Sequence, residues 1–199
     1  MFVKVCGLRT AEDVAAAVAA GADAVGFLLS DSPRRVSVEQ ARRLAAEVPL
    51  EVLTVAVYQE EPAEQVRAEV RAAGMRAVQL HGAHPPRAFA ELGDLGVTLV
   101  RATAAATAGS AECGEFGEDL LILDSPRPGS GEAWDWSALR GRRSGRWLLA
   151  GGLNPGNVAQ AVAGADPWGV DVSSGVEISR GVKDPELIAE FVRLAKAAG

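Results

Sequence analysis

The chain has 199 residues, with 26 acidic and 20 basic side chains, a formal charge of −6 and a pI near 5.0. This acidic balance argues against nucleic acid or an anionic membrane as the main partner. The two cysteines, Cys6 and Cys113, lie far apart, so neither a disulfide framework nor a zinc site is expected. A strand pattern begins at once, without a signal peptide, and no apolar run approaches membrane-spanning length. We therefore expect a cytoplasmic protein with one domain, residues 1–199.

Short apolar runs that are typical of β-strands alternate with helix-like runs along the whole chain. The strand-like runs cover residues 2–6, 24–28, 52–58, 77–80, 97–102, 120–123, 147–150 and 169–172. A helix is predicted from the N-cap Thr10 to residue 19. Ser37 and Gln40 have the spacing of a capping box for the next helix, which extends to about residue 47.

The later helices carry start signals of the same kind. Pro62 is expected to start the third helix, and Asp184 is expected to open the last one. After the seventh strand, Asn154 is predicted as an N-cap with Pro155 in the first helical position. Residues 103–117 are mostly small, which predicts a short or irregular fifth helical segment. Cys113 lies in it and is interpreted as structural or incidental.

Eight strand-then-helix repeats without a linker or charge block are typical of a (β/α)8 TIM barrel of the α/β class. At this length the loops must be short. A doubly wound open sheet is the alternative, but it usually has fewer units, and no dinucleotide fingerprint follows the first strand. The sequence therefore predicts a single TIM barrel with short loops and an irregular fifth helical segment.

Two strand ends near the C-terminus are rich in glycine and serine. The seventh strand runs into Gly151 and Gly152, and the eighth into Ser173, Ser174 and Gly175. Glycines let backbone N–H groups approach a ligand closely, and (β/α)8 barrels commonly bind phosphate after strands 7 and 8. Ordinary tight turns are the alternative, but two such exits in succession favour a phosphate site.

The carboxyl ends of barrel strands meet at one mouth, so the residues there are candidates for a common site. Cys6 and Asp124, a thiol and a carboxyl group across one cavity, suit acid–base chemistry on a phosphorylated substrate. Each residue also has a structural interpretation: Cys6 as a small core side chain, Asp124 as a loop cap. The candidates at the mouth are Cys6, Arg34, His81, Asp124, Gly151, Gly152, Asp171, Ser173 and Ser174.

Seven motifs stand in the order found in one known family, and they cover nearly the whole chain. The motifs are Lys4–Leu8, Gly21–Phe27, Ser32–Arg34, Val78–Gly82, Leu123–Ser125, Gly151–Val158 and Asp171–Glu177. Together they resemble the phosphoribosylanthranilate isomerase family of tryptophan biosynthesis. The Cys-Gly opening and the Asp-Val-Ser-Ser-Gly-Val-Glu segment are the most specific of the seven.

The resemblance implies an Amadori rearrangement of N-(5-phosphoribosyl)anthranilate to 1-(2-carboxyphenylamino)-1-deoxyribulose 5-phosphate, without cofactor or metal. By the family pattern, Asp124 is the general acid that opens the furanose ring, and Cys6 is the general base that removes the C2 proton. Arg34 would bind the anthranilate carboxylate, His81 would lie beside the aromatic ring, and Asp171 would contact the sugar hydroxyls. The phosphate would be held by backbone N–H groups around Gly151, Gly152, Ser173, Ser174 and Gly175.

The chain departs from the family pattern in its loops. The departures are at residues 56–59, 128–131, 134–136 and 180–181, where Ala-Val-Tyr-Gln, Pro-Gly-Ser-Gly, Trp-Asp-Trp and Arg-Gly stand in place of the usual motifs. None of them removes a catalytic position.

Two other functions are considered. The related histidine-pathway isomerisation of a phosphoribosyl formimino compound is less favoured, because the first strand ends in Cys6 and no second phosphate loop follows His81. A non-catalytic barrel that binds a phosphorylated metabolite is the third hypothesis. In every case the expected partner is a small phosphorylated molecule, and the sequence is compatible with a monomer and with a homodimer.

Overall fold

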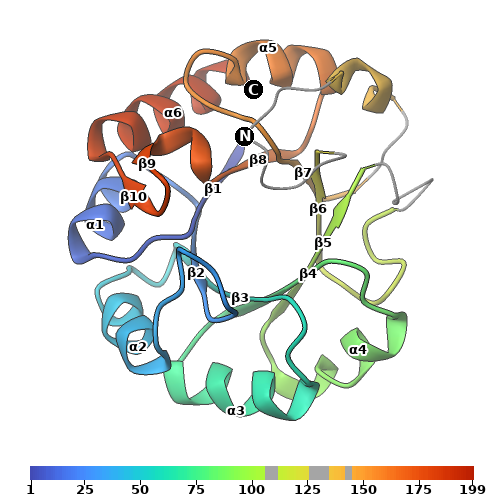
Figure 1. The fold of residues 1–199 in the computed structure, drawn as a ribbon. Coiled ribbons are helices and arrows are strands. Elements are labelled where there is room, and N and C mark those ends of the chain that lie inside the picture. Colours follow the sequence, from blue (N-terminus) through green and yellow to red (C-terminus); the bar gives the residue numbers. More distant parts are fainter. Residues whose placement is uncertain (106–111, 126–134, 142–144) are drawn as a thin grey trace.

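The computed structural model describes residues 1–105, 112–125, 135–141 and 145–199. Within them, eight parallel strands close into one barrel in the order β1 to β8, surrounded by helices (Figure 1). The strands are β1 (Phe2–Cys6), β2 (Ala24–Leu28), β3 (Leu53–Tyr58), β4 (Ala77–His81), β5 (Thr98–Ala104), β6 (Leu120–Asp124), β7 (Trp147–Leu149) and β8 (Gly169–Val172). The predicted TIM barrel is confirmed.

The helices differ in length around the barrel. They are α1 (Ala11–Ala19), α2 (Val38–Ala46), α3 (Ala63–Ala73), α4 (Pro86–Ala90), α5 (Val158–Ala165) and α6 (Pro185–Ala198). Short 3₁₀ turns cover Gly93–Leu95, Trp136–Leu139 and Ser174–Val176, and a hairpin of β9 (Glu177–Ser179) and β10 (Val182–Lys183) precedes α6. None of the helices in the described ranges combines the length and apolar character that crossing a bilayer requires.

Only part of the segment after β5, for which a short or irregular helix is predicted, belongs to the described residues. Residue 105 and residues 113–116 form turns, and residues 106–111 lie outside the described part of the chain. Arg101 of β5 anchors this segment from the barrel wall: its guanidinium lies 4.1 Å from the centre of the Phe116 ring and pairs with Glu118 at 2.7 Å. A buried ion pair and a ring contact therefore hold the described residues of this segment against the barrel wall.

Alternating side chains of each strand point into the barrel or toward the helices. The inward set forms a compact cluster of small and branched residues: Cys6, Ala24, Val55, Val57, Ala77, Val100, Ala102, Leu120, Ile122, Leu148 and Ala150. The larger core lies between the strands and the helices and includes Val5, Phe27, Leu121 and Phe191. Cys6 belongs to the inward set, which is required for a side chain that lines the barrel mouth.

Several helix starts are those that the sequence predicts. Thr10 caps α1: its hydroxyl accepts the N–H of Asp13 at 3.1 Å, and the Asp13 carboxylate accepts the N–H of Thr10 at 3.2 Å. Asp184 caps α6 through the N–H of Glu186 at 2.8 Å. These caps satisfy donors that would otherwise remain unpaired at the helix starts.

The helix predicted from Asn154 begins later than expected. Asn157 is the residue before α5, and Asn154 heads a turn in front of it. The Asn154 carboxamide oxygen accepts the N–H of Gly156 at 2.8 Å, and its own N–H donates to the Asn157 side chain at 2.8 Å. The asparagine side chains thus satisfy the backbone in a non-helical conformation.

The predicted capping box of α2 forms only in part. Ser37 accepts the N–H of Gln40 at 3.1 Å, as expected. The Gln40 side chain does not return to Ser37; it donates to the carbonyl of Arg9 at 2.7 Å. Gln40 therefore connects α2 to the loop after β1.

Candidate active site

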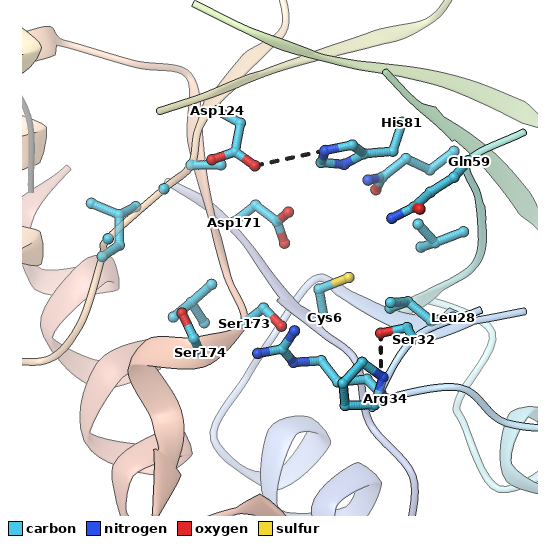
Figure 2. Close-up of a pocket in the computed structure, with 18 of the residues that line it drawn as sticks. Cys6, Leu28, Ser32, Arg34, Gln59, His81, Asp124, Asp171, Ser173 and Ser174 are labelled. Atoms are coloured by element: carbon cyan, nitrogen blue, oxygen red, sulfur yellow. Dashed lines mark hydrogen bonds and ion pairs between the residues drawn. The ribbon is translucent and has the colours of Figure 1, made fainter. Parts of the chain in front are cut away.

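A cavity of about 320 Å³ opens at the carboxyl ends of the strands (Figure 2). Side chains from strands on opposite sides of the barrel share it, which is the arrangement that a TIM-barrel mouth provides. It is lined by Cys6, Leu28, Asp31, Ser32, Pro33, Arg34, Val57, Gln59, Gln79, His81, Asp124, Ala150, Gly151, Gly152, Leu153, Asp171, Val172, Ser173, Ser174 and Arg180.

Cys6 ends β1 and is buried, with its thiol at the floor of the cavity (Figure 2). Its neighbour in register on β2 is Gly26, and a Cβ at Gly26 would lie 2.9 Å from the Cys6 sulfur. The absence of a side chain on β2 therefore makes the space that the thiol occupies. Burial raises the pKa of Cys6 above its ordinary 9.0, although the nearby Lys4 ammonium acts in the opposite direction.

Asp124 ends β6 on the other side of the cavity, with His81 of β4 next to it (Figure 2). Its Oδ2 lies 3.8 Å from His81 Nε2, and its Oδ1 accepts the N–H of Ser125 at 2.7 Å. Burial raises the pKa of Asp124 above 3.8 against the opposing effect of His81. Burial also lowers the pKa of His81, so a neutral imidazole faces a carboxyl group that holds its proton more readily than usual.

Asp171 of β8 also lines the cavity, and its carboxylate forms an ion pair with Lys4 at the floor. Lys4 of β1, its partner in the β1–β8 register, places Nζ 2.9 Å from Asp171 Oδ1. Gln79 of β4 also lines the cavity, and its buried side-chain oxygen has no hydrogen-bond partner among the described residues. The floor of the site is therefore polar, and the Gln79 oxygen accepts no hydrogen bond from the described residues.

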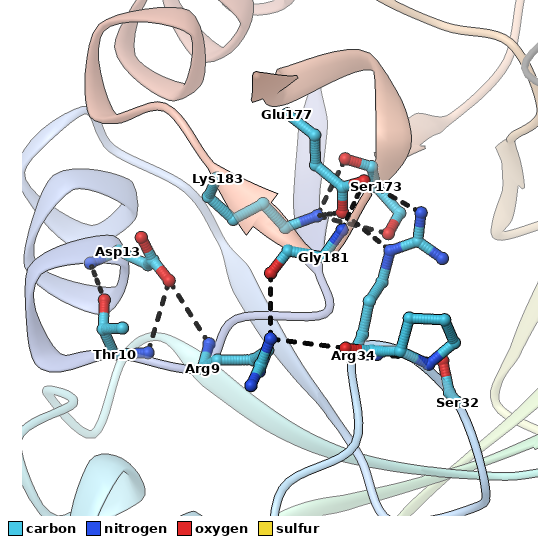
Figure 3. A network of polar contacts seen from close by, with 10 residues as sticks. Arg9, Thr10, Asp13, Ser32, Arg34, Ser173, Glu177, Gly181 and Lys183 are labelled. Carbon is cyan, nitrogen blue, oxygen red and sulfur yellow. Dashed lines mark hydrogen bonds and ion pairs between the residues drawn. The ribbon is translucent and has the colours of Figure 1, made fainter. Parts of the chain in front are cut away.

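Arg34 lies in the loop after β2, and a polar network holds it (Figure 3). Its Nε and Nη2 donate to the two oxygens of Glu177 at 2.7 and 3.0 Å, and Lys183 contacts Glu177 at 2.9 Å. Burial alone would raise the pKa of Glu177, but the bonds from Arg34 and Lys183 hold it at about 2. Gly7 leaves room for the arginine: a Cβ there would lie 2.8 Å from Arg34 Cδ.

Arg9 extends the network between the same two loops (Figure 3). Its Nη1 donates to the carbonyls of Pro33 and Gly181, at 3.3 and 3.2 Å. The loop that carries Arg34 and the β9–β10 hairpin are thus joined twice, once by Glu177 and once by Arg9. The direction of the Arg34 side chain is set by this double connection.

The glycine-rich ends of β7 and β8 lie side by side at the cavity. Gly151 and Gly152 have positive φ angles of 85° and 68°, a conformation that favours glycine. A Cβ at Gly151 would lie 2.5 Å from Asp124 Oδ1, so this glycine also makes room for the carboxyl group. Gly175 packs against the carbonyl of Leu153, where a Cβ would come within 1.7 Å.

The structure places nine of the ten predicted site residues around one cavity. They are Cys6, Arg34, His81, Asp124, Gly151, Gly152, Asp171, Ser173 and Ser174. Gly175 does not line the cavity; it brings the β8 loop against the β7 loop. Residues 128–131 and Trp134, which the family comparison of the sequence singled out, lie outside the described residues.

Some residues of the site were not predicted. Lys4 and Gln79 point inward one step below Cys6 and His81, and the two-residue period of the strands was the signal that could have identified them. Glu177 ends the last of the family motifs, but its contacts with Arg34 and Lys183 join loops that lie apart in the sequence. Among the described residues, no group of three or more His, Cys, Asp or Glu side chains is arranged to hold a metal ion.

Comparisons with known proteins point to one family. The model of the N-(5'phosphoribosyl)anthranilate (PRA) isomerase family matches residues 3–194. An N-(5'-phosphoribosyl)anthranilate isomerase from Rubrobacter xylanophilus is 40% identical over 203 residues, which cover 98% of each chain. The enzyme of the same name from Hyphomonas neptunium is 41% identical over 207 residues, 98% of this chain and 97% of that one.

Solved structures agree with this. TrpF from Jonesia denitrificans has a TM-score of 0.91 and 42% identity, covering 100% of this chain and 98% of that one. A phosphoribosyl anthranilate isomerase solved with reduced 1-(o-carboxyphenylamino)-1-deoxyribulose 5-phosphate has a TM-score of 0.86 and 33% identity, covering 99% of both chains. The relative from Thermotoga maritima is described as dimeric. With its barrel, its shared cavity and a match over almost its whole length, the chain belongs to the N-(5'-phosphoribosyl)anthranilate isomerase family.

Proposed function

We propose that this chain, as a single catalytic barrel over residues 1–199, converts N-(5'-phosphoribosyl)anthranilate into 1-(2-carboxyphenylamino)-1-deoxyribulose 5-phosphate. The observation that carries the proposal is the position of Cys6 and Asp124, from β1 and β6, at one cavity of about 320 Å³. Membership in the isomerase family supports the reaction. So does the relative solved with a reduced form of the product.

Asp124 acts first, as the general acid. Burial favours its protonated form, and the Ser125 N–H fixes Oδ1, so that Oδ2 faces the cavity. The carboxyl group gives its proton to the furanose ring oxygen as the C1–O bond breaks. The lone pair of the anthranilate nitrogen forms the C1=N bond, and an open-chain Schiff base results.

Cys6 acts second, as the general base. Its thiolate takes the C2 proton of the sugar, and the electrons of that C–H bond form the C1–C2 double bond of an enol-amine as the C1=N π electrons return to nitrogen. The enol-amine then tautomerises to the 2-keto product, so that the whole reaction is an internal redox rearrangement with no external oxidant. Both groups lie in a largely buried site, where charge effects are stronger than in water.

The two ends of the substrate bind on different sides of the cavity. Arg34 keeps Nη1 for the anthranilate carboxylate, since Nε and Nη2 are used by Glu177. His81 lies beside the aromatic ring, and Asp171 contacts the sugar hydroxyls. The phosphate lies at the paired β7 and β8 loops, at the backbone N–H groups of Gly151, Gly152, Ser173 and Ser174, and Gly175 holds the two loops together.

Loss of substrate fluorescence with the purified protein tests the proposal. We expect turnover of phosphoribosylanthranilate, and a fall in kcat of at least about 10²-fold in Cys6→Ala and in Asp124→Asn. Cys113→Ser is the matched control, because this second thiol is outside the cavity and bonds to the carbonyl of Asp119. If Cys6→Ala had the turnover of the parent, Cys6 would not be the general base. The same result in Asp124→Asn would show that Asp124 is not the general acid.

A further inference from the structure

Lys4 is a buried lysine inside the barrel for which the proposed reaction has no use as an acid or a base. It is 2% exposed and stands two residues before Cys6 on β1, so both side chains point into the barrel. A lysine is almost never fully buried without partners, because removal of its charge from water is costly. Its position directly beneath the catalytic thiol therefore requires an explanation.

The ammonium group of Lys4 is paired with a carboxylate at the floor of the site. Nζ lies 2.9 Å from Asp171 Oδ1, across the β1–β8 register in which Lys4 and Asp171 are opposite each other. Cys6 stands two residues further along the same face of β1, and the charge of Lys4 lowers the pKa of its thiol. One cation thus pairs with the proposed sugar-binding carboxylate and lies on the same strand face as the proposed base.

Resting on the proposed function, we propose that Lys4 is a positioning residue: its ammonium stabilises the Cys6 thiolate and holds Asp171 in place during proton abstraction from the sugar. Without this cation, the thiolate would form in a buried site next to a carboxylate. With it, the two anionic groups share one positive charge.

Several charged groups face Cys6, and their effects differ in sign. Burial is the largest and raises the pKa of the thiol; Lys4 lowers it, Asp171 raises it, and Lys183 lowers it. Arg34, from the loop after β2, is a further cation near the thiol. Among these groups Lys4 has the largest lowering effect on the pKa of Cys6.

Lys4 itself remains charged over the working pH range. Burial would lower its pKa, but Asp171 and Cys6 outweigh this effect, and the pKa lies above the ordinary 10.5. A purely structural lysine would stabilise the barrel in the same way but would leave the reactivity of the thiol unchanged.

The thiol itself provides the test. In a Cys113→Ser background, so that Cys6 is the only thiol, the rate of alkylation by iodoacetamide is measured against pH without substrate. In Lys4→Met we expect the midpoint to rise by one pH unit or more, which slows alkylation at pH 8 by about tenfold. We also expect kcat to fall by a similar factor. Lys196→Met, which breaks the Lys196–Asp23 pair at 2.6 Å outside the cavity, should leave the midpoint unchanged.

A second variant covers the case in which Lys4→Met leaves Asp171 unpaired and the protein does not fold. Lys4→Met/Asp171→Asn removes both charges at nearly constant volume, a change that buried ion pairs often tolerate. Its midpoint should lie between those of the parent and Lys4→Met. A parent-like midpoint in either folded variant overturns the proposal for Lys4. Loss of isomerase turnover in the parent itself would overturn the proposed function and leave the alkylation result intact.

Discussion

The two side chains of the proposed acid–base pair each lie against a glycine of the neighbouring strand or loop. A Cβ at Gly26 would lie 2.9 Å from the Cys6 sulfur, and one at Gly151 would lie 2.5 Å from Asp124 Oδ1. Real Cβ atoms do not come this close to other heavy atoms, so any side chain at these positions must displace the catalytic group. The glycines therefore define where the thiol and the carboxyl group can be.

Gly26→Ala tests this directly. Because the added methyl group must displace the sulfur, we expect kcat to fall by about 10²-fold, the order of loss that follows a shift of about 1 Å in a reacting group. Steady-state kinetics with a thermal melt checks that the loss exceeds any loss of stability. Gly93→Ala is the control, because a Cβ at Gly93 has nothing within 4 Å. Ordinary kcat in Gly26→Ala would show that the thiol has room to move.

Among single residues, the sequence predicted the site residues at the strand ends and missed the inward-pointing residues two positions earlier in the strands. Cys6 and Asp124 are predictable because barrel strands deliver their last side chains to one mouth. Lys4 also points inward by the same alternation, but its pairing with Asp171 depends on the register between β1 and β8, which no local pattern contains. Gly151 was predicted for phosphate, and its contact with Asp124 needs the three-dimensional path of two strands.

Among the elements, the short hairpin of β9 and β10 has the most connections to the site. Glu177 of β9 bonds Arg34 in the loop after β2, and Lys183 of β10 bonds both Glu177 and Ser173 at the end of β8 (Figure 3). The hairpin therefore links the side of the cavity proposed for the carboxylate to the side proposed for the phosphate. Its exposed turn carries Arg180, a departure from the family pattern that also lines the cavity.

Glu177→Gln should destabilise the protein in a pH-dependent way. The carboxylate is 4% exposed and its pKa is lowered from 4.5 to about 2, so its stabilising effect is full above 4.5 and is lost as the pH falls through 2. We expect the free energy of unfolding to drop by about 3 kcal/mol at pH 7, and the difference from the parent to shrink between pH 4.5 and 2. Urea melts at several pH values measure it.

Glu39→Gln is the control for this experiment. Glu39 also pairs with an arginine, Arg42, at 2.9 Å, but both side chains are more than half exposed, at 61% and 56%. Solvent screens such a pair, so its removal should leave the melts unchanged. If Glu177→Gln behaved like Glu39→Gln at pH 7, the buried network would not stabilise the hairpin.

The predicted strands agree closely with the observed ones, and the helix starts agree less well. Strands are short apolar runs, and their ends are marked by a change to polar residues or glycine, as at Asp124. Helix starts depend on which of several polar side chains bonds the backbone. Asn154 was expected as a cap but forms a turn with Asn157, and Gln40 bonds the Arg9 carbonyl in place of its own helix. Such competition between nearby partners is decided in three dimensions.

For the molecule as a whole, the pairing of the first strand with the last is the contact that closes the barrel. β1 and β8 pair in parallel from Phe2 opposite Gly169 to Val5 opposite Val172. The same seam contains the Lys4–Asp171 pair, so closure of the barrel and assembly of the floor of the site are one structural event. Closure brings together residues about 170 positions apart. The repeat pattern predicts that the first and last strands pair, but it does not predict which residues lie opposite each other.

Gly169 makes this seam possible, and its replacement is the test at the scale of the whole molecule. A Cβ at Gly169 would lie 2.6 Å from the Phe2 carbonyl oxygen, which is held by the backbone of β1 and cannot turn aside. We expect Gly169→Ala to lower the free energy of unfolding by about 1–3 kcal/mol, the usual cost of overpacking. Gly164→Ala in α5 meets open space and should stabilise the protein by roughly 0.5–1 kcal/mol, because alanine is a better helix former. Denaturant melts of the two variants measure the change in the free energy of unfolding relative to the parent. Equal changes would mean that the contact between β1 and β8 adapts to a methyl group. Changes of opposite sign would locate the constraint at that contact.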